Sequence, residues 1–484
     1  MSILNFLKKW IRKIFVDYNE INRICANNIK SIDDKISITN SEIELKSNNI
    51  KEDIVEIKKQ QGVLENEITN IKKQNEITIK ELKKISDQFL FYNMELANIK
   101  IDVQLKNILI VGFYGAPNLG DELMLETLLE YLENIPNKKI TVLLADNPEY
   151  DIEKYKDVRF IHYPKTLYDF NIIAEQYDYI IFGGGAIIDD KQFEKENAYQ
   201  YDLGTILLKL SIRAIAFNKK VICLALSASK EILNLEYLEK LKYIIQNAHY
   251  FSVRDTYTKD YLTEKLGNEC GNKIIKVSDI VLANKKIFEN IKNKKQIKNE
   301  LNIGIAWISN DNDINKVECV LNNIQEYVKK SEINECNVNF IPFYEYGNID
   351  TVFYRKILKN TYSRLKINIE KYPENMKKTI DLFKKNDIII GMRYHSILMA
   401  HALNIPCISV CYDVHAHYTY KIKYLNKLFE QDEALSYKNI EYSNFCDKLK
   451  EIYGQDNKNG YEKSRKIGLL AQKQILESIN KIFN

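Results

Sequence analysis

Short runs of apolar residues alternate with amphipathic stretches along the chain from about residue 105 onward. Several runs are apolar throughout and stop at glycine or at a charged residue, which is typical of strands buried in a parallel sheet. The stretches between them repeat apolar residues at helical spacing. This alternation predicts an α/β fold of two Rossmann-like domains, residues 105–285 and 300–435, followed by helices in 436–484 that pack back onto them.

The expected strands and helices keep this alternating order. The strands are Asn107–Gly112, Ile140–Leu144, Tyr179–Phe182, Val221–Leu226, Phe251–Val253, Ile274–Val277, Ile303–Trp307, Val338–Phe343, Ile388–Ile390 and Cys407–Cys411. The helices are Leu203–Phe217, Leu235–Gln246, Tyr257–Leu266, Lys316–Lys330, Asp350–Lys359, Met376–Lys385, Ser396–Leu403 and Ser464–Phe483. A polar, lysine-rich stretch at 283–300 is expected to link the two domains.

Residues 17–104 follow a seven-residue pattern instead. One seam of isoleucine and leucine recurs every seven positions from Ile29 to Ile99 and is interrupted only at Thr78 and Tyr92. Strict repeats of seven predict a long α-helical coiled coil, in which polar residues on the second seam fix the register. We therefore expect the chain to form a homo-oligomer through this segment. The alternative is a single helix that folds back on the globular part.

Residues 1–16 combine large apolar side chains with a cluster of cations. On a helix, Trp10 and Phe15 share one side with most of the other apolar residues, and no acid occurs before Asp17. The cations that flank this side are Lys8, Lys9, Arg12 and Lys13. The pattern predicts an amphipathic basic helix that contacts an anionic membrane surface without crossing it. The alternative is a helix that packs on its own protein.

Composition narrows the functional classes. The chain has 484 residues, of which 45% are hydrophobic and 28% charged, as in ordinary globular proteins. Its 70 basic and 66 acidic residues are too evenly balanced to indicate nucleic acid as a partner. The eight cysteines form no Cys-x-x-Cys pair and fit reduced thiols. Because no apolar run reaches the ~18 residues that span a membrane, we expect a cytoplasmic protein, peripheral on the inner face of the cell membrane.

The strongest candidate site follows the expected strand Ile388–Ile390. Gly391 ends this strand, and Arg393 and His395 come just before the free backbone N–H groups at the start of a helix. Because they stand at positions i and i+2, their side chains can emerge on one side. A guanidinium fork, an imidazole and a helix N-terminus together suit a carboxylate or a phosphate. The alternative is that both side chains only cap the helix or pair with an acid.

A glycine-rich turn follows the first expected strand. Its glycines and the acids after them are Gly112, Gly115, Gly120, Asp121 and Glu122. The glycines free the backbone at a strand-to-helix turn, and the acids fall in the first turn of an amphipathic helix. The spacing is not Gly-x-Gly-x-x-Gly, so a dinucleotide site has only Asp146 in its support. Alternatively, the acids only complement the helix dipole.

Other polar or glycine-rich motifs also stand where expected strands end. They are the triple glycine Gly183, Gly184 and Gly185, the pair Arg254 and Asp255, and the single Asp279. In a parallel sheet the carboxyl ends of the strands meet at one edge, which is where ligands bind. Each motif alone could be turn chemistry. Together they predict one functional edge, and Arg393 and His395 are expected to face it across a cleft.

Taken together, these motifs resemble the polysaccharide pyruvyl transferase family, bacterial enzymes that attach a pyruvate ketal to surface glycans. The resemblance covers about residues 107–413 and rests on five motifs. They are NLGDE at Asn118–Glu122, the triple glycine, SVRD at Ser252–Asp255, an aspartate at Asp279, and GMRYHSILMAHALNIPCISVCYD at Gly391–Asp413. It implies a GT-B-like fold with phosphoenolpyruvate as donor. The implied acceptor is a pair of sugar hydroxyls in a bacterial surface polysaccharide or its lipid-linked precursor.

The resemblance also implies roles for individual residues. Arg254, Arg393 and His395 are expected to hold the donor, and a histidine that titrates near neutrality suits a general acid. Asp121 is expected to orient or deprotonate the acceptor hydroxyl. Further substrate contacts are expected from Asn118, Gly120, Glu122, Gly183, Gly184, Gly185, Asp255, Tyr394 and Ser396. The chemistry requires no metal and no cofactor besides the donor.

Other functions remain open at this stage. A GT-B-type nucleotide-sugar glycosyltransferase would have the same shape, although the acid that usually holds the donor ribose has no clear counterpart in the second domain. A non-catalytic anion-binding module tethered by the coiled coil is a further alternative. The pair His415 and His417 is compatible with a zinc site, but no third potential ligand lies near them in the sequence.

Overall fold

The computed structural model describes residues 105–145, 155–191, 202–228, 231–291, 300–358, 362–412, 416–440, 445–454 and 458–483, with a few helical positions between 30 and 73. The chain divides into two compact units, and the larger, residues 105–215 and 219–484, holds both sheets. The predicted basic helix in 1–16 lies outside the described residues. So does almost all of the predicted coiled coil in 17–104.

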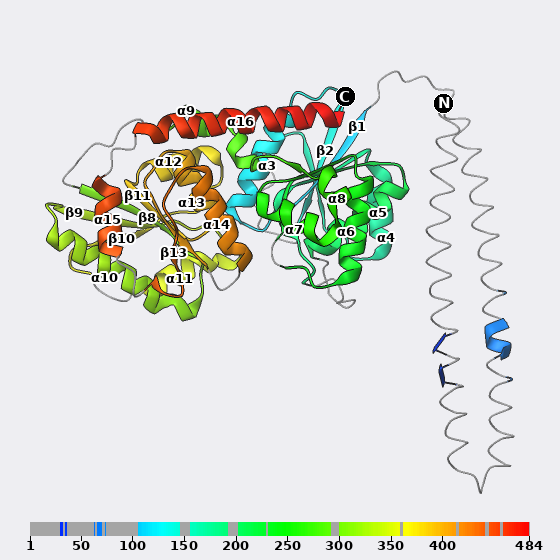
Figure 1. The fold of residues 1–484 in the computed structure, drawn as a ribbon, viewed down its shortest axis with the longest axis horizontal. Coiled ribbons are helices and arrows are strands. Elements are labelled where there is room, and N and C mark those ends of the chain that lie inside the picture. Colours follow the sequence, from blue (N-terminus) through cyan, green and yellow to red (C-terminus); the bar gives the residue numbers. More distant parts are fainter. Residues whose placement is uncertain are drawn as a thin grey trace, which may run out of the picture. The chain divides into compact units, whose positions relative to one another are not determined.

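The first domain is a seven-stranded parallel sheet in the order β3-β2-β1-β4-β5-β6-β7, flanked by helices (Figure 1). Its strands are β1 Lys106–Val111, β2 Lys138–Leu144, β3 Val158–His162, β4 Tyr179–Ile188, β5 Lys220–Ala228, β6 Tyr250–Val253 and β7 Ile275–Lys276. Its helices are α3 Leu119–Leu132, α4 Leu167–Gln176, α5 Leu203–Ala216, α6 Leu235–Asn247, α7 Thr256–Leu266 and α8 Asn268–Lys273. The central strands are almost wholly buried, which explains their unbroken apolar sequence.

The second domain is a six-stranded parallel sheet in the order β10-β9-β8-β11-β12-β13. Its strands are β8 Glu300–Ala306, β9 Glu335–Phe340, β10 Lys366–Ile369, β11 Ile388–Gly391, β12 Cys407–Cys411 and β13 Leu435–Ser436. Its helices are α10 Ile314–Lys330, α11 Ile349–Ile357, α12 Met376–Lys384, α13 Tyr394–Ala402, α14 Ala416–Leu428 and α15 Phe445–Gly454. The two sheets together form the predicted α/β fold of two Rossmann-like domains.

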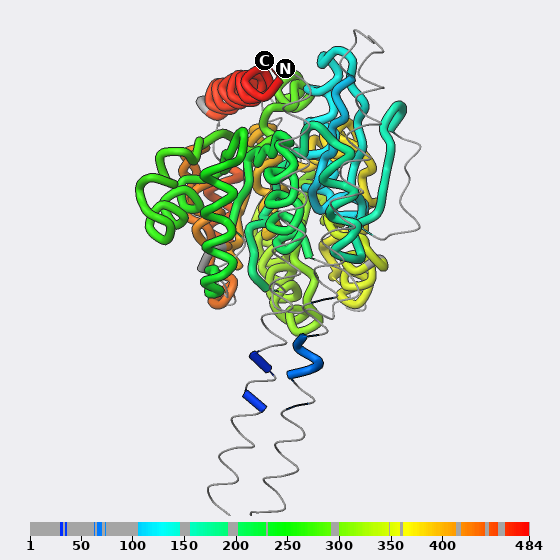
Figure 2. The backbone as a smooth tube through the Cα atoms, turned by 90° about the vertical axis from the view of Figure 1, so that its right-hand side faces the viewer, coloured from blue at the N-terminus to red at the C-terminus, as the bar shows by residue number. Residues whose placement is uncertain are grey.

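The last helix, α16 (Lys458–Phe483), joins the two domains. It runs across the top of both in Figure 1, and Figure 2 views it nearly end-on. Near its start, the Ser464 hydroxyl donates to the carbonyl of His401 on α13 at 2.8 Å. Near its end, Ser478 shares a hydrogen bond of 2.7 Å with the hydroxyl of Tyr250 on β6. The helix therefore packs back on the first domain as well as the second.

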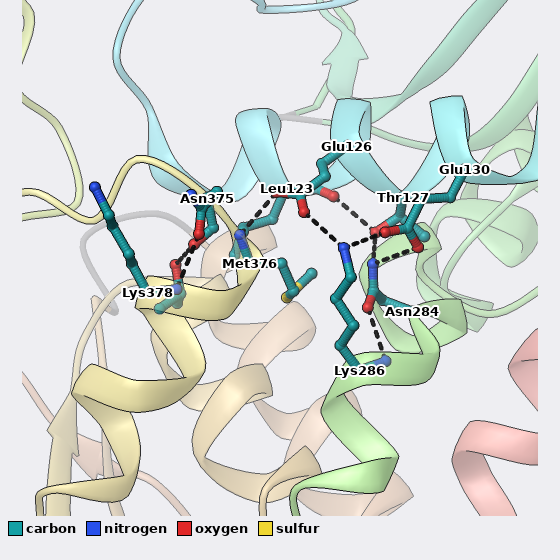
Figure 3. A network of polar contacts seen from close by, with 10 residues as sticks. Leu123, Glu126, Thr127, Glu130, Asn284, Lys286, Asn375, Met376 and Lys378 are labelled. Carbon is teal, nitrogen blue, oxygen red and sulfur yellow. Dashed lines mark hydrogen bonds and ion pairs between the residues drawn. The ribbon is translucent and has the colours of Figure 1, made fainter. Parts of the chain in front are cut away.

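A second connection lies between α3 and the start of α12 (Figure 3). Glu126 on α3 accepts the backbone N–H of Met376 at 2.7 Å and the ammonium of Lys286 at 3.2 Å. Lys286 also pairs with Glu130, whose carboxylate accepts a hydrogen bond from Asn284 at 3.2 Å. Glu126 thus satisfies an N–H at the beginning of a helix in the other domain, where a carboxylate also complements the helix dipole.

The structure departs from the sequence prediction in several elements. The strands β3 and β10 were not predicted because both lie at sheet edges and carry half-exposed, partly polar residues. The triple glycine, expected as a loop after a strand, lies inside β4, which continues to Ile188. The expected linker at 283–300 starts where the 3₁₀ turn Ile280–Ala283 ends, and it contains α9, Lys285–Glu289, in which Ile287 is buried. Within the described residues, no helix is long and apolar enough to cross a membrane.

Candidate active site

The two domains meet directly at the glycine-rich turn before α3. Asn118 forms an isolated antiparallel bridge with Tyr344, which follows β9 in the second domain. The N–H of Leu119, the first residue of α3, donates to the carbonyl of Phe343 at 2.8 Å. The amino end of α3 is therefore fixed against the second domain by backbone hydrogen bonds. The predicted motifs of both domains are gathered around this junction.

Arg393 is held by a buried carboxylate. It is the N-cap residue of α13, and its Nη2 donates to Oδ1 of Asp350 at 2.6 Å. Asp350 has no exposed surface, and its other oxygen accepts the N–H groups of Phe343 and Tyr344, each at 2.8 Å. Its Oδ1 also accepts the hydroxyl of Ser309 at 2.5 Å. Because four donors fix this carboxylate, the position of the Arg393 guanidinium is set by its partner.

Arg254 has an equally buried partner in the first domain. Its Nη1 donates to Oδ2 of Asp279 at 2.7 Å, and both side chains are at least 96% buried. The guanidinium carbon lies 4.3 Å from the centre of the Tyr394 ring, a cation–π contact between the domains. Burial alone would raise the pKa of Asp279, but the Arg254 and His395 side chains outweigh it and hold that pKa below its usual range. Tyr394, predicted as a substrate contact, thus supports the arginine.

His395 lies between Asp279 and the first turn of α3. Its Nε2 is 3.6 Å from Oδ2 of Asp279, which is beyond hydrogen-bond distance. Its Nδ1 faces Gly120, where an added Cβ would come within 1.9 Å of it. Burial lowers the pKa of His395, although the nearby Asp279 carboxylate opposes the shift. The near-neutral titration expected for His395 stays a prediction, and burial acts against it.

Asp121 and Glu122 have different surroundings at the start of α3. Glu122 is buried and accepts the N–H of Gly115 at 3.0 Å, so it shapes the glycine-rich turn. Asp121 is also buried. Burial raises the pKa of Asp121 to about 8, against the opposing charge of Arg254. Burial therefore favours the protonated form of the Asp121 carboxyl.

The triple glycine allows α3 to approach the sheet closely. Gly184 and Gly185 have φ of 87° and 91°, a conformation that favours glycine. A Cβ at Gly183 would lie 2.6 Å from the hydroxyl of Tyr114, and one at Gly184 would lie 2.7 Å from the sulfur of Met124. These glycines therefore let α3 lie close to the sheet, and their role as substrate contacts stays a prediction.

A cavity of about 550 Å³ opens beside Asp121. Its lining includes Asn118 and Asp121 from the first domain and the rings of Tyr344 and Tyr346 from the second. Asp189, which follows β4, adds a further carboxylate to the wall. The volume falls within the range of ligand sites, and its mixture of aromatic rings and carboxylates can meet both the apolar faces and the hydroxyls of a sugar.

Two predicted contacts serve the local backbone instead. The hydroxyl of Ser396 is fully buried and donates to the carbonyl of Arg393 at 2.7 Å. Asp255 caps α7 by accepting the N–H of Thr258 at 2.7 Å, and it also accepts the hydroxyl of Ser227 at 2.8 Å. Both side chains thus shape the turns that carry the two arginines, and a role for either in binding stays a prediction.

Three side-chain nitrogens at this junction lack partners. Nε of Arg254, Nε of Arg393 and Nε2 of His395 are each buried, with no hydrogen-bond partner within the described residues. Buried polar atoms are normally satisfied, so such a group in a folded protein needs an explanation. All three belong to the motifs that the sequence predicted as an anion site. No cluster of three or more metal-ligating side chains occurs among the described residues.

Sequence reasoning missed Asp350, the partner of Arg393. It was placed only at the start of a predicted helix, about forty positions before Arg393. The one sequence feature that points to Asp350 is its position shortly after a predicted strand, where a functional acid is expected in a parallel sheet. The predicted zinc alternative at His415 and His417 concerns side chains outside the described residues.

Comparison with protein families gives one match to this part of the chain. The model of the family described as polysaccharide pyruvyl transferase matches residues 118–414. This range includes Gly120, Asp121 and Glu122 at the end of the glycine-rich turn, and also both arginines and His395. A comparison with curated proteins found no match.

Comparison with solved structures identifies the fold. A glycosyltransferase from Rickettsia africae has a TM-score of 0.50 at 12% identity, over 78% of this chain and 98% of its own. The UDP-GlcNAc 2-epimerases of Methanocaldococcus jannaschii and Neisseria meningitidis give TM-scores of 0.47 and 0.46 at 12% and 14% identity, over 78% of this chain and 99% and 100% of their own. The first likeness shows the GT-B-like fold, and at this identity it shows the fold alone.

Proposed function

The chain belongs to the polysaccharide pyruvyl transferase family, and on that premise we propose that it transfers a pyruvyl group from phosphoenolpyruvate to two hydroxyls of a sugar, forming a pyruvate ketal. The acceptor belongs to a bacterial surface polysaccharide or its lipid-linked precursor. The observation that carries the proposal is the cluster of buried nitrogens on Arg254, Arg393 and His395 that have no hydrogen-bond partner among the described residues.

The chemistry of the donor matches these groups. Phosphoenolpyruvate carries a carboxylate and a phosphate, the latter with a charge of about −1.5 to −2 near neutral pH. Each arginine is anchored by one nitrogen on an aspartate, Arg254 on Asp279 and Arg393 on Asp350, and keeps other nitrogens for a ligand. Anchored guanidinium groups bind an anion in a fixed geometry, which reduces the entropy lost when the donor meets the acceptor.

Asp121 and His395 are the titratable groups that we assign to proton transfer. Burial raises the pKa of Asp121 to about 8 and lowers that of His395, so it favours the protonated carboxyl and the neutral imidazole. Opposite shifts of this kind assign a general acid and a general base. We therefore propose Asp121 as the proton donor and His395 as the proton acceptor, the reverse of the sequence expectation. A bound anion raises both pKa values, which makes His395 a stronger base.

The proposed reaction balances with these two groups. Asp121 protonates the methylene carbon of the donor, which becomes a methyl group, and the first sugar hydroxyl adds to the neighbouring carbon while His395 takes its proton. The bond from that carbon to the phosphate oxygen then breaks and phosphate leaves. The second hydroxyl closes the ketal, and its proton leaves with the phosphate. The proton on His395 returns to Asp121 through solvent, so both groups are restored.

We assign the acceptor to the cavity beside Asp121. Tyr344 and Tyr346 offer ring faces to a pyranose, and Asp189 offers carboxylate oxygens to its hydroxyls. The bridge between Asn118 and Tyr344 keeps both walls of this cavity at a fixed separation. An acceptor in this position lies next to the proton donor.

The remaining parts of the proposal concern residues outside the described ones. We propose that residues 17–104 associate as a homo-oligomeric coiled coil, on the seven-residue seam of isoleucines. We propose that residues 1–16 bring the protein to the cytoplasmic face of the cell membrane, on their pairing of cations with apolar side chains. A lipid-linked acceptor would lie at the same surface.

The test is a transfer assay with radiolabelled phosphoenolpyruvate and a panel of lipid-linked and free glycans. We expect the label to appear in the glycan, with one phosphate released for each ketal that is formed. The same panel with UDP-sugars tests the glycosyltransferase alternative, which expects a new sugar on the glycan and no use of phosphoenolpyruvate. Donor binding without turnover on any glycan would favour the non-catalytic module.

A further inference from the structure

One lysine in this region was not singled out by the sequence. Lys421 lies on α14 and is 5% exposed. It makes no hydrogen bond and no ion pair with any described residue. Lysine is almost never fully buried unless its charge is paired, because an unpaired ammonium loses its hydration without compensation. A buried lysine without a partner is therefore a candidate for binding an anion that arrives from outside.

The helix that carries Lys421 is tied to both arginine-bearing turns. The hydroxyl of Tyr418 donates to the carbonyl of Met392 at 2.8 Å and accepts the N–H of Tyr394 at 3.1 Å. The ring of Tyr420 stacks on that of Tyr257 in the first turn of α7, with centroids 4.6 Å apart. Lys421 follows Tyr420 directly, so α14 carries it between the Arg393 turn and the Arg254 turn.

The electrostatic surroundings of Lys421 agree with this position. Burial and the Arg254 charge together lower its pKa to about 7, against the opposing charges of Asp255 and Asp189. The Lys421 charge in turn contributes to the lowered pKa of His395. Its neighbours are thus the groups to which the donor site has been assigned. Near neutral pH, a small change in surroundings decides whether this ammonium is charged.

The charges of the donor site are otherwise nearly balanced. Arg254 is paired with Asp279, and Arg393 is paired with Asp350. A donor with a carboxylate and a phosphate brings more negative charge than these two neutral pairs can offset. Lys421 is the buried basic side chain at this junction that has no carboxylate partner of its own among the described residues.

We propose that Lys421 is a third donor-binding cation, which pairs with the phosphate group of the donor. The inference rests on the proposed function and adds to it a residue and a contact. A compact ammonium acts as a point charge and suits a phosphate, whereas the arginine forks suit the planar carboxylate. The same contact would hold the phosphate after it leaves the ketal carbon.

Calorimetry with phosphoenolpyruvate, inorganic phosphate and pyruvate tests the proposal on the full-length protein. Lys421→Met keeps the length of the side chain and removes its charge, and Lys421→Arg restores a cation. Lys423→Met, at an exposed lysine on the same helix, is the matched control. We expect Lys421→Met to bind phosphoenolpyruvate and phosphate about 10- to 150-fold more weakly, the range for a contact between charged groups. Pyruvate should bind equally, and Lys421→Arg should recover part of the loss.

Thermal unfolding of the same variants separates binding from structure. Lys421→Met removes an unpaired buried charge, so its unfolding midpoint should equal or exceed that of the parent, whereas a structural lysine would lower it when lost. Equal phosphate binding by parent and Lys421→Met would overturn this inference and leave the proposed function intact. Weakened pyruvate binding would overturn the assignment to phosphate. A parent protein that binds no phosphoenolpyruvate would overturn both proposals.

Discussion

The ring of His395 rests on the α-carbon of Gly120, so closely that a methyl group added at Gly120 would lie 1.9 Å from Nδ1. The two residues come from different domains and are far apart in the sequence. Because any other side chain at position 120 would displace the imidazole, this glycine fixes where the ring sits relative to Asp121, the next residue. The contact therefore couples the proposed proton donor and acceptor.

Gly120→Ala tests this coupling. Alanine favours the helical conformation at this position, but its Cβ must push the His395 ring aside. We expect kcat to fall on the order of 100-fold, since displacement of a reacting group by about 1 Å has a cost of that size. Steady-state kinetics measure it. Gly62→Ala is the control, because an added Cβ there meets nothing within 4 Å; a similar loss in both variants would argue against the contact.

The raised pKa of Asp121 makes stability depend on pH. The pKa of about 8 in the folded protein exceeds the ordinary value of 3.8, so the protonated carboxyl favours the fold. This contribution is present at low pH and is lost as the pH rises through 8. Asp121→Asn removes the titration, so its unfolding midpoint relative to the parent should rise between pH 5 and pH 8. A difference that does not vary with pH would contradict the shifted pKa.

The same titration should appear in the reaction rate. If protonated Asp121 supplies the proton, kcat/KM must fall as the pH rises above about 8, where the free protein loses that proton. Asp121→Asn should lower the rate strongly and remove this decline from whatever activity remains. An alkaline limb that survives in Asp121→Asn would assign the proton donor to another group.

Asp350 should prove essential for placing Arg393. In Asp350→Asn, an amide N–H₂ replaces one carboxylate oxygen, and the four donors now share a single acceptor. We expect a loss of about 1–3 kcal/mol in the free energy of unfolding, the cost of leaving a buried donor unpaired, together with weaker donor binding. Asp311→Asn is the control, since its ion pair with Lys356 is exposed and contributes at most about 1 kcal/mol.

The sequence predicted the α/β fold and drew attention to Arg254, Arg393 and His395, but it did not predict the side chains that these residues contact. The unbroken apolar runs of the central strands identified both sheets, whereas the edge strands β3 and β10 carry too many polar residues to be found this way. Arg393 and His395 were identified because they stand two positions apart after a strand. Asp350, Gly120 and Lys421 reach the same place from distant elements, and sequence spacing does not reveal such contacts.

The pKa shifts of His395 and Asp121 could not be predicted from the sequence either. A histidine at a helix start is expected to titrate near neutrality. His395 and Asp121 are both buried where the domains meet, and burial lowers the pKa of the first and raises that of the second because it penalises the charged form of each. The direction of each shift follows from burial, which only the folded chain determines.

Calorimetry of phosphoenolpyruvate binding to the parent protein and to Arg393→Ala tests whether the junction of the two domains binds the donor. We predict that the folded variant binds the donor about 10- to 150-fold more weakly, because it loses a charge-assisted contact. Arg364→Ala, at an exposed arginine of the same domain, should bind like the parent. Equal affinity of parent and Arg393→Ala in calorimetry would contradict the claim that this junction binds the donor.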